Sequence, residues 1–175
     1  MLEGVAVMLR LVLSILALSM MLISGCDPQG RPLEHPGLDR LRPGISGEFD
    51  VRGVFGVPEM IVEERDGTRT FQYPLGPEGP RTFFATLGPD GKLIRVWNVL
   101  APETFAKIVP GMPRDDVRLL LGRPGRQQTY ELKRQTAWEW KILGEQRDKR
   151  FYVLFDEAGR VVASGIEDPS LSAGR

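Results

Sequence analysis

Hydrophobic positions beyond residue 40 follow a helical period in two short segments. Apolar residues spaced three and four apart predict one buried helical face, and the segments with this spacing are 51–55 and 117–121. Gly56 and Gly122 follow them, where a helix can end in a left-handed turn. Shorter helices are expected just before these two. The remaining expectations for this region are first helices at 38–41 and 103–109, a cap from Ser46, and Pro113 in the first turn of the later helix.

The rest of this region is rich in β-branched and aromatic runs separated by turn residues. Asp66-Gly67 and Asp90-Gly91 are typical hairpin turns between such runs. Because short turns join the runs, we expect two antiparallel meanders. Because helices precede strands in each half, we expect an α+β fold with the helices on one face of each sheet. The expected strands are 60–64, 68–73, 82–87, 93–99, 127–131, 137–143, 149–155 and 161–165.

The two halves of this pattern align with each other. Gly56-x-Pro58 matches Gly122-x-Pro124 at an offset of 66 residues. The aromatic run FQY at 71–73 matches WEW at 138–140, and FFATL at 83–87 matches FYVLF at 151–155. We infer a duplication. The expected repeats are 38–100 and 101–168, each a short helix-turn-helix on a three- to four-stranded antiparallel meander, with a tail at 169–175.

The N-terminal segment has a different pattern. Leu11–Ile23 is an apolar run of thirteen residues that follows Arg10 and ends at small residues. This arrangement is typical of a signal peptide, and the run is well short of the ~20 residues that a membrane-spanning helix needs. The start of translation stays open between Met1 and Met8, since a start at Met8 gives the more usual leader.

The residues that close this run carry a first resemblance. Ile23-Ser24-Gly25-Cys26 resembles a bacterial lipobox, which implies cleavage between Gly25 and Cys26 and a lipid on Cys26, the single cysteine of the chain. Residues 1–25 are then the signal peptide, and the Pro- and Gly-rich stretch 26–37 is a flexible tether. Asp27 resembles the inner-membrane retention signal of enteric bacteria. We expect a periplasm-facing lipoprotein, with the outer membrane favoured over the inner one and the choice left open.

A second resemblance comes from the later repeat. The pattern PGM-x4-V-x3-LG-x-P at 110–124, then WEW, then FYVLFDEAGRV at 151–161, resembles the SmpA/OmlA (BamE-like) lipoprotein family. The resemblance implies a binding or scaffold component of the envelope, with the outer-membrane β-barrel assembly complex as a candidate partner. The chain departs from the family in having two units. Their tandem arrangement is similar to the β-lactamase-inhibitor protein, which leaves a stand-alone binding or inhibitor module with a concave sheet as the alternative.

The composition of the chain limits the functions that it can have. Lys+Arg and Asp+Glu are 23 each, so the chain lacks the strongly basic balance of a dedicated nucleic-acid binder. The single histidine, His35, lies in the tether, which leaves no histidine for a catalytic pair or a Cys/His metal site in either repeat. Neighbouring acids such as Asp115 and Asp116 diverge. We therefore expect no enzyme, no metal and no cofactor besides the covalent lipid on Cys26.

Aromatic and basic side chains are the candidate partner-binding residues. Trp138 and Trp140 lie two apart on a strand and share one face, as do Phe71 and Tyr73. Either this row lies under the helices, or it forms an exposed binding surface. The later repeat is also the more basic, with 11 basic and 8 acidic residues over 109–166, among them Arg123 and Arg126. Two interpretations stay open for this charge: contact with anionic lipid head groups, or a solvated surface.

Overall fold

The computed structural model describes residues 35–76, 79–144 and 149–167. Residues 40–175 form one compact unit that contains both sheets. The predicted signal peptide, Gly25, Cys26, most of the predicted tether and the tail at 169–175 lie outside the described residues. Among the residues described, no helix is long and apolar enough to cross a membrane.

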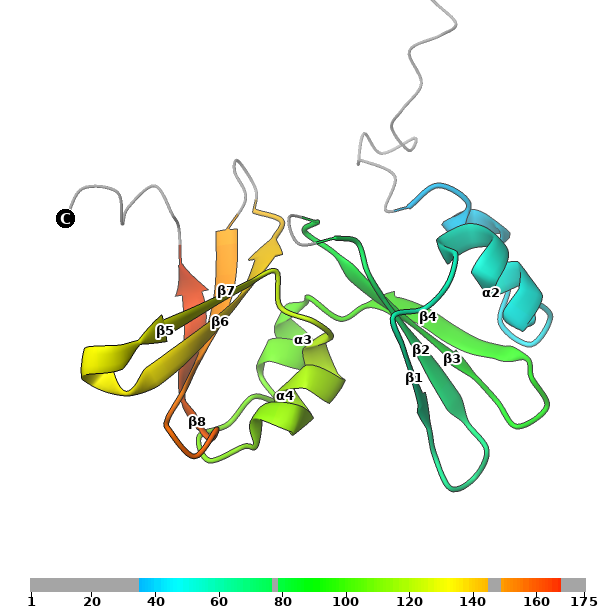
Figure 1. The fold of residues 1–175 in the computed structure, drawn as a ribbon. Coiled ribbons are helices and arrows are strands. Elements are labelled where there is room, and N and C mark those ends of the chain that lie inside the picture. The colour runs from blue at the N-terminus through cyan, green and yellow to red at the C-terminus, as the bar shows by residue number, and fades with distance from the viewer. Residues whose placement is uncertain (1–34, 77–78, 145–148, 168–175) are drawn as a thin grey trace, which may run out of the picture. The chain divides into compact units, whose positions relative to one another are not determined.

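Each repeat places its α-helices before a four-stranded antiparallel meander, as expected (Figure 1). The strand orders are β1-β2-β3-β4 and β5-β6-β7-β8. The fold is therefore α+β. The first repeat contains η1 (Leu38–Arg40), α2 (Glu48–Phe55), β1 (Met60–Glu63), β2 (Arg69–Pro74), β3 (Thr82–Leu87) and β4 (Leu93–Asn98). The second contains α3 (Pro102–Phe105), α4 (Arg114–Leu121), β5 (Arg126–Tyr130), η2 (Glu131–Lys133), β6 (Gln135–Ile142), β7 (Lys149–Phe155) and β8 (Val161–Glu167).

The two repeats share even their irregularities. The register shifts between Thr86 and Leu87 in the first sheet and between Leu154 and Phe155 in the second. In the first repeat the Gly44 amide donates to the Leu93 carbonyl, and in the second Gly111 donates to Val161, both at 2.8 Å. Matching bulges and matching turn bonds are what a duplication produces.

Helix ends differ in detail from the expectation. Ser46 does not cap α2; its Oγ instead accepts from the Arg42 amide at 2.9 Å, so the hydroxyl closes the preceding turn. Gly47 is the N-cap, and the Asp50 carboxylate accepts from its amide at 2.8 Å. Pro113 occupies the cap position of α4, one residue before the first turn. The helix expected at 103–109 stops at Phe105, because the backbone beyond it continues in tighter turns.

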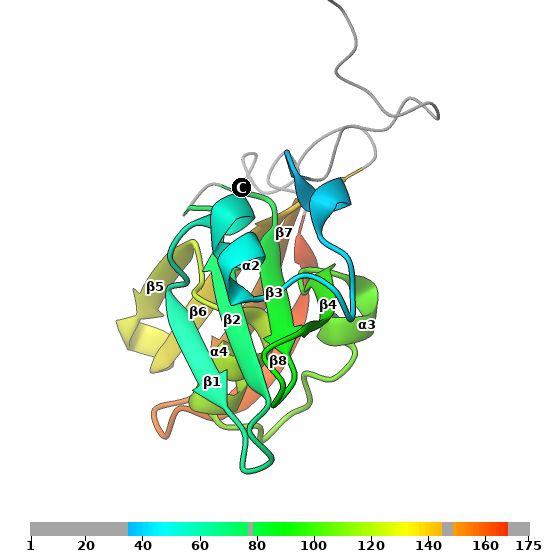
Figure 2. The same cartoon turned by 90° about the vertical axis from the view of Figure 1, so that its right-hand side faces the viewer.

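One face of the first sheet lies under α2. Phe55 stacks on Tyr73 of β2 at 4.9 Å and meets Phe83 of β3 at 5.3 Å between ring centroids. Val51, on the same side of the helix, is fully buried. Figure 2 shows α2 lying across β2 and β3. Burial of this apolar face is what holds the helix, since an eight-residue helix is unstable in isolation.

One face of the second sheet packs against α3 and α4. Phe105 of α3 stacks on Phe151 of β7 with ring centroids 3.9 Å apart. Trp138 and Phe155 lie edge to face at 5.0 Å and belong to the same buried cluster as Val117 of α4. The expectation that helices cover one face of each sheet is confirmed.

Candidate functional site

Each sheet also has a face turned away from the helices of its own repeat, and these faces are the candidate site. We call them the first and second outer faces. The alternation of side chains along the strands defines them. The first outer face carries Thr70, Gln72, Phe84 and Trp97, and the second carries Ala137, Glu139, Tyr152 and Leu154.

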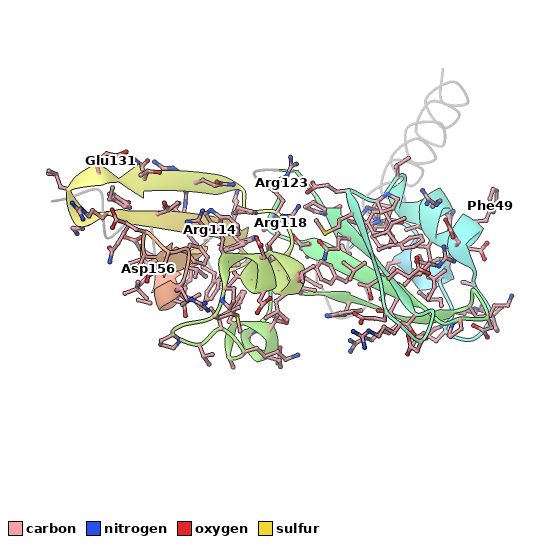
Figure 3. The ribbon with its side chains drawn as sticks, turned by 60° about the horizontal axis from the view of Figure 1, so that its bottom comes forward. Phe49, Arg114, Arg118, Arg123, Glu131 and Asp156 are labelled. Atoms are coloured by element: carbon pink, nitrogen blue, oxygen red, sulfur yellow. The ribbon has the colours of Figure 1, made fainter. Side chains whose placement is uncertain are left out.

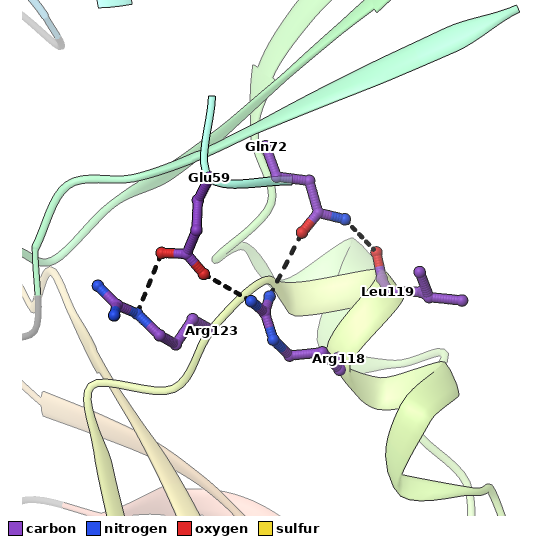
Figure 4. Close-up of polar contacts among 5 residues, drawn as sticks. All are labelled: Glu59, Gln72, Arg118, Leu119 and Arg123. Carbon is purple, nitrogen blue, oxygen red and sulfur yellow. Dashed lines mark hydrogen bonds and ion pairs between the residues drawn. The ribbon is translucent and has the colours of Figure 1, made fainter. Parts of the chain in front are cut away.

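The first outer face receives the end of α4, from the second repeat (Figure 4). Gln72, which is only 1% exposed, donates from Nε2 to the Leu119 carbonyl at 3.3 Å. Arg118 donates from its guanidinium to Gln72 Oε1 at 3.4 Å. At the end of the helix, Gly122 lies so close to the sheet that a Cβ there would be 2.9 Å from Thr82 Cγ2. The helix end therefore fits this face through a bare backbone and one amide side chain.

An acidic residue completes this contact between the repeats. The Glu59 carboxylate lies 2.6 Å from the Arg118 guanidinium and 3.1 Å from that of Arg123. Figure 3 shows Arg118 on α4 and Arg123 just beyond its end. Arg123, a predicted partner-binding residue, is thus paired within the chain, although its side chain is 53% exposed.

A groove of ≈310 Å³ remains on the first outer face beside α4. Its wall contains Trp97, which meets Phe84 edge to face and is covered by the Arg95 guanidinium at 3.8 Å from the ring centroid. Leu119 and Leu120 of α4 also line the groove. The groove is the part of this face that the helix does not fill.

The second outer face carries a comparable groove with no such helix. No helix of the described residues bonds to this face, and Tyr152 and Leu154 are half-exposed. The Tyr152 ring lies over Gly165 of the edge strand, where a Cβ would be 2.9 Å from its hydroxyl. The groove measures ≈260 Å³ and is lined by Tyr130, Lys133, Gln135, Ala137, Glu139, Tyr152, Leu154 and Glu167.

The two grooves occupy equivalent positions in the two repeats. Five of the residues that line the second groove occupy positions equivalent to residues that line the first. The difference is the occupant, since only the first face holds a helix end from the described residues. The equivalent pairs are Glu64 and Tyr130, Thr70 and Ala137, Gln72 and Glu139, Phe84 and Tyr152, and Val99 and Glu167.

Arginines surround the acid of the second outer face. Glu139 accepts from Arg150 at 2.8 Å and lies 3.9 Å from Arg126, and its side chain is only 15% exposed. Arg126, the other basic residue expected to bind a partner, is 57% exposed at this edge. Two guanidiniums around one carboxylate give this cluster a net positive charge, and a second acid, Glu167, also lines the groove opposite Arg150.

The four predicted aromatic residues lie in the core, which corrects the alternative that they form an exposed binding row. Phe71, Tyr73, Trp138 and Trp140 are between 0% and 7% exposed. The reason is register: Trp138 lies opposite Val153 and Trp140 opposite Phe151, on the face that the helices cover. The half-exposed row is the adjacent one, with Tyr152 and Leu154. The sequence of 151–155 gave little signal for this choice, because both faces of that strand are largely apolar.

Little in the described residues suggests chemistry. No three His, Cys, Asp or Glu residues among them gather as a metal site would require. Several buried polar atoms of the described residues lack a hydrogen-bond partner, including the Tyr73 hydroxyl and the indole nitrogens of Trp138 and Trp140. The Arg114 guanidinium lies over the rings of Trp138 and Phe155, at 5.7 and 5.2 Å from their centroids. None of these groups lines either groove.

Comparison with known proteins gives no match to a protein-family model and no match among curated proteins. Solved structures show a weak likeness. One described as the osmotically inducible lipoprotein OsmE is 25% identical, covering 39% of this chain and 73% of its own, with a TM-score of 0.34. A candidate β-lactamase inhibitor protein from Streptococcus mutans is 12% identical, covering 74% and 92%, with a TM-score of 0.33. The resemblance to lipoprotein and inhibitor structures is coarse, and at these TM-scores it carries no argument.

Proposed function

We propose that the protein is a membrane-anchored lipoprotein of the bacterial envelope that acts as a non-catalytic binding module. The observation that carries the proposal is the second outer face. It holds a groove with half-exposed aromatic and aliphatic side chains beside two arginines, while the equivalent face of the first repeat is occupied. Aromatic side chains and arginine are favoured at protein interfaces.

The N-terminal sequence supports the membrane anchor. The lipobox-like residues 23–26 support a lipid on Cys26, and the tether behind it contains three prolines between residues 27 and 37. A Pro-rich spacer of this length reaches roughly 30 Å. The folded repeats would thus work close to the membrane, where their partner is an envelope protein. The resemblance to the SmpA/OmlA family makes the β-barrel assembly complex of the outer membrane the first candidate.

The proposal is tested by finding what binds the second outer face. Intact cells are chemically cross-linked, the tagged full chain is purified, and the proteins recovered with it are identified. We expect barrel-assembly components in excess over other lipoproteins. A single unrelated soluble protein would favour the stand-alone inhibitor, and turnover of a substrate by the purified chain would contradict a non-catalytic role.

A matched pair of variants connects the recovered protein to the groove. Leu154→Asp introduces a charge on the second outer face, and Ile61→Asp does the same at an exposed position of β1 in the first repeat. We expect Leu154→Asp to lower recovery about tenfold or more, as loss of a central interface contact does, and Ile61→Asp to leave it unchanged. Equal recovery with both variants, each folded by circular dichroism, would exclude the second outer face as the binding surface.

A further inference from the structure

We infer that the second outer face receives the C-terminal turn of an α-helix from a partner protein. This inference rests on the proposed function and adds what the partner presents. The chain itself contains the reason: the equivalent face of the first repeat already holds such a helix end, and five equivalent positions line both grooves.

The first outer face recognises features that only the end of a helix has. The last carbonyls of a helix have no partner within it, and one of them, that of Leu119, accepts from Gln72. Gly122 follows with φ +75° and no side chain, which allows the backbone to approach Thr82 and Phe84. A helix that passed over the sheet along its middle would present neither an unpaired carbonyl nor a bare glycine.

The second outer face keeps part of this arrangement and adds charged side chains. Tyr152 stands at the position of Phe84, and Ala137 at that of Thr70, so an aromatic ring again lies beside a small side chain, while polar side chains line more of this groove than of the first. Glu139 stands at the position of Gln72 and brings two guanidiniums, those of Arg150 and Arg126, to the place where Gln72 donates its single bond. Cations favour the negative end of a helix dipole. The face therefore complements the last turn of a helix.

The occupant is a different protein rather than a second copy of this chain. By the repeat, α2 of another copy is the equivalent of α4. However, Gly53 and Val54 stand where α4 has Leu119 and Leu120, which removes most of the apolar contact surface. Arg52 stands at the position of Arg118 and would face the arginines of the second outer face. The fitting helix ends in two large apolar residues and a glycine, with a neutral or acidic side chain in place of Arg118.

Site-specific photo-cross-linking tests this inference in intact cells carrying the full chain. The photoreactive residue p-benzoylphenylalanine replaces Tyr152 in one strain and Tyr130, which lines the same groove and is 42% exposed, in another. Thr129, exposed on the opposite side of β5, is the matched control. We expect one protein adduct from the two groove positions, mapped by mass spectrometry to the last turn of a helix, and none from Thr129. Arg126→Glu should lower the adduct yield about fivefold or more.

The outcomes separate the inference from the proposed function. Adducts from the groove that map to strands or loops of a partner would overturn the helix end and leave the binding module intact. Adducts within residues 48–57 of this chain would show a second copy and overturn the partner helix. No protein adduct from Tyr152 or Tyr130, in cells where chemical cross-linking still recovers a partner, would overturn the site alone. Failure of both experiments would count against the module itself.

Discussion

At the scale of single residues, Tyr73 buries a polar group in an apolar place. Its side chain is 3% exposed and stacked on Phe55, and its hydroxyl has no hydrogen-bond partner among the described residues. Burial is the main reason why the pKa of Tyr73 is raised from its ordinary 10.0 to about 12. The hydroxyl therefore opposes folding, while the ring contributes to the core.

Tyr73→Phe removes that hydroxyl and keeps the ring. We expect the free energy of unfolding to rise by up to about 1 kcal/mol at neutral pH, because an unpaired buried hydroxyl is unfavourable. The wild type should also lose stability between pH 10 and 12, since Tyr73 ionises in the unfolded chain before it does in the folded one. Denaturant titrations at pH 7 and pH 11 measure both effects. Tyr152→Phe is the control, and a destabilised Tyr73→Phe variant would mean that the hydroxyl has a partner.

The proposed membrane anchor depends on Cys26. Cys26→Ser removes the thiol to which a lipid would be attached, so we expect a chain that is soluble or unprocessed. Detergent phase partitioning and the intact mass of the purified protein measure this outcome. Multiple acyl chains hold a protein firmly on a membrane, so a variant with unchanged membrane extraction and unchanged mass would contradict lipidation.

The sequence predicted which residues are buried better than it predicted which residues are exposed. The two-residue spacing of Trp138 and Trp140 correctly predicted that both side chains lie on one face of the sheet. Spacing alone does not say which face of the sheet the helices cover. That choice depends on the strand opposite, where Phe151, Val153 and Phe155 are all buried. The exposed row of the site could have been chosen only by comparing both faces of both strands.

At the scale of elements, α2 and α4 end in equivalent glycines with different surroundings. Gly56 has φ +81° and no atom within 4 Å of an added Cβ, whereas Gly122 has φ +75° and faces Thr82 of the first sheet. Positive φ alone makes a side chain unfavourable by about 1–2 kcal/mol. The two positions thus separate backbone strain from the contact between the repeats.

We expect Gly122→Ala to lower the free energy of unfolding more than Gly56→Ala does. Gly56→Ala introduces only the backbone strain, about 1 kcal/mol, whereas Gly122→Ala adds a clash that displaces α4 from the first outer face, for a total of about 2–3 kcal/mol. Thermal and denaturant unfolding of the two variants measure the difference. Equal losses would show that the end of α4 does not press on the first sheet.

Elements themselves were predictable because local rules and tertiary packing agree in most of this chain. The strand expected at 82–87 and that at 149–155 have the bounds the sequence indicated. The prediction was wrong where a side chain can form either of two local hydrogen bonds. The Ser46 hydroxyl closes a turn, and Gly47 is the N-cap of α2. Residue propensities do not say which of the two hydrogen bonds forms, because each of them satisfies one backbone amide.

At the scale of the whole unit, the contact between the repeats was not predictable. The duplication indicated two similar halves, and each half was expected to cover one sheet face with its own helices. That α4 would serve two sheets depends on Gln72, Glu59 and Gly122 acting together, from segments more than 45 residues apart. The periodicity of one segment carries no information about its contacts with the other segment. The sequence therefore does not distinguish the occupied first outer face from the open second outer face.

The pairing of Glu59 with Arg118 and Arg123 should couple the unfolding of the two repeats. The carboxylate and the Arg118 side chain are 29% and 20% exposed, so we expect Glu59→Ala to lower the free energy of unfolding by about 1 kcal/mol or less. Added to Gln72→Ala, which leaves the Leu119 carbonyl without its bond, it should broaden the denaturation transition or split it in two. The half-exposed Trp97 of the first sheet and the buried Trp140 of the second allow fluorescence to follow each repeat. The control is Glu63→Ala, which removes an exposed acid on β1. If Glu63→Ala lowers stability as much as Glu59→Ala does, the repeats are coupled by something other than this contact. The same conclusion follows if the double variant unfolds in one sharp transition.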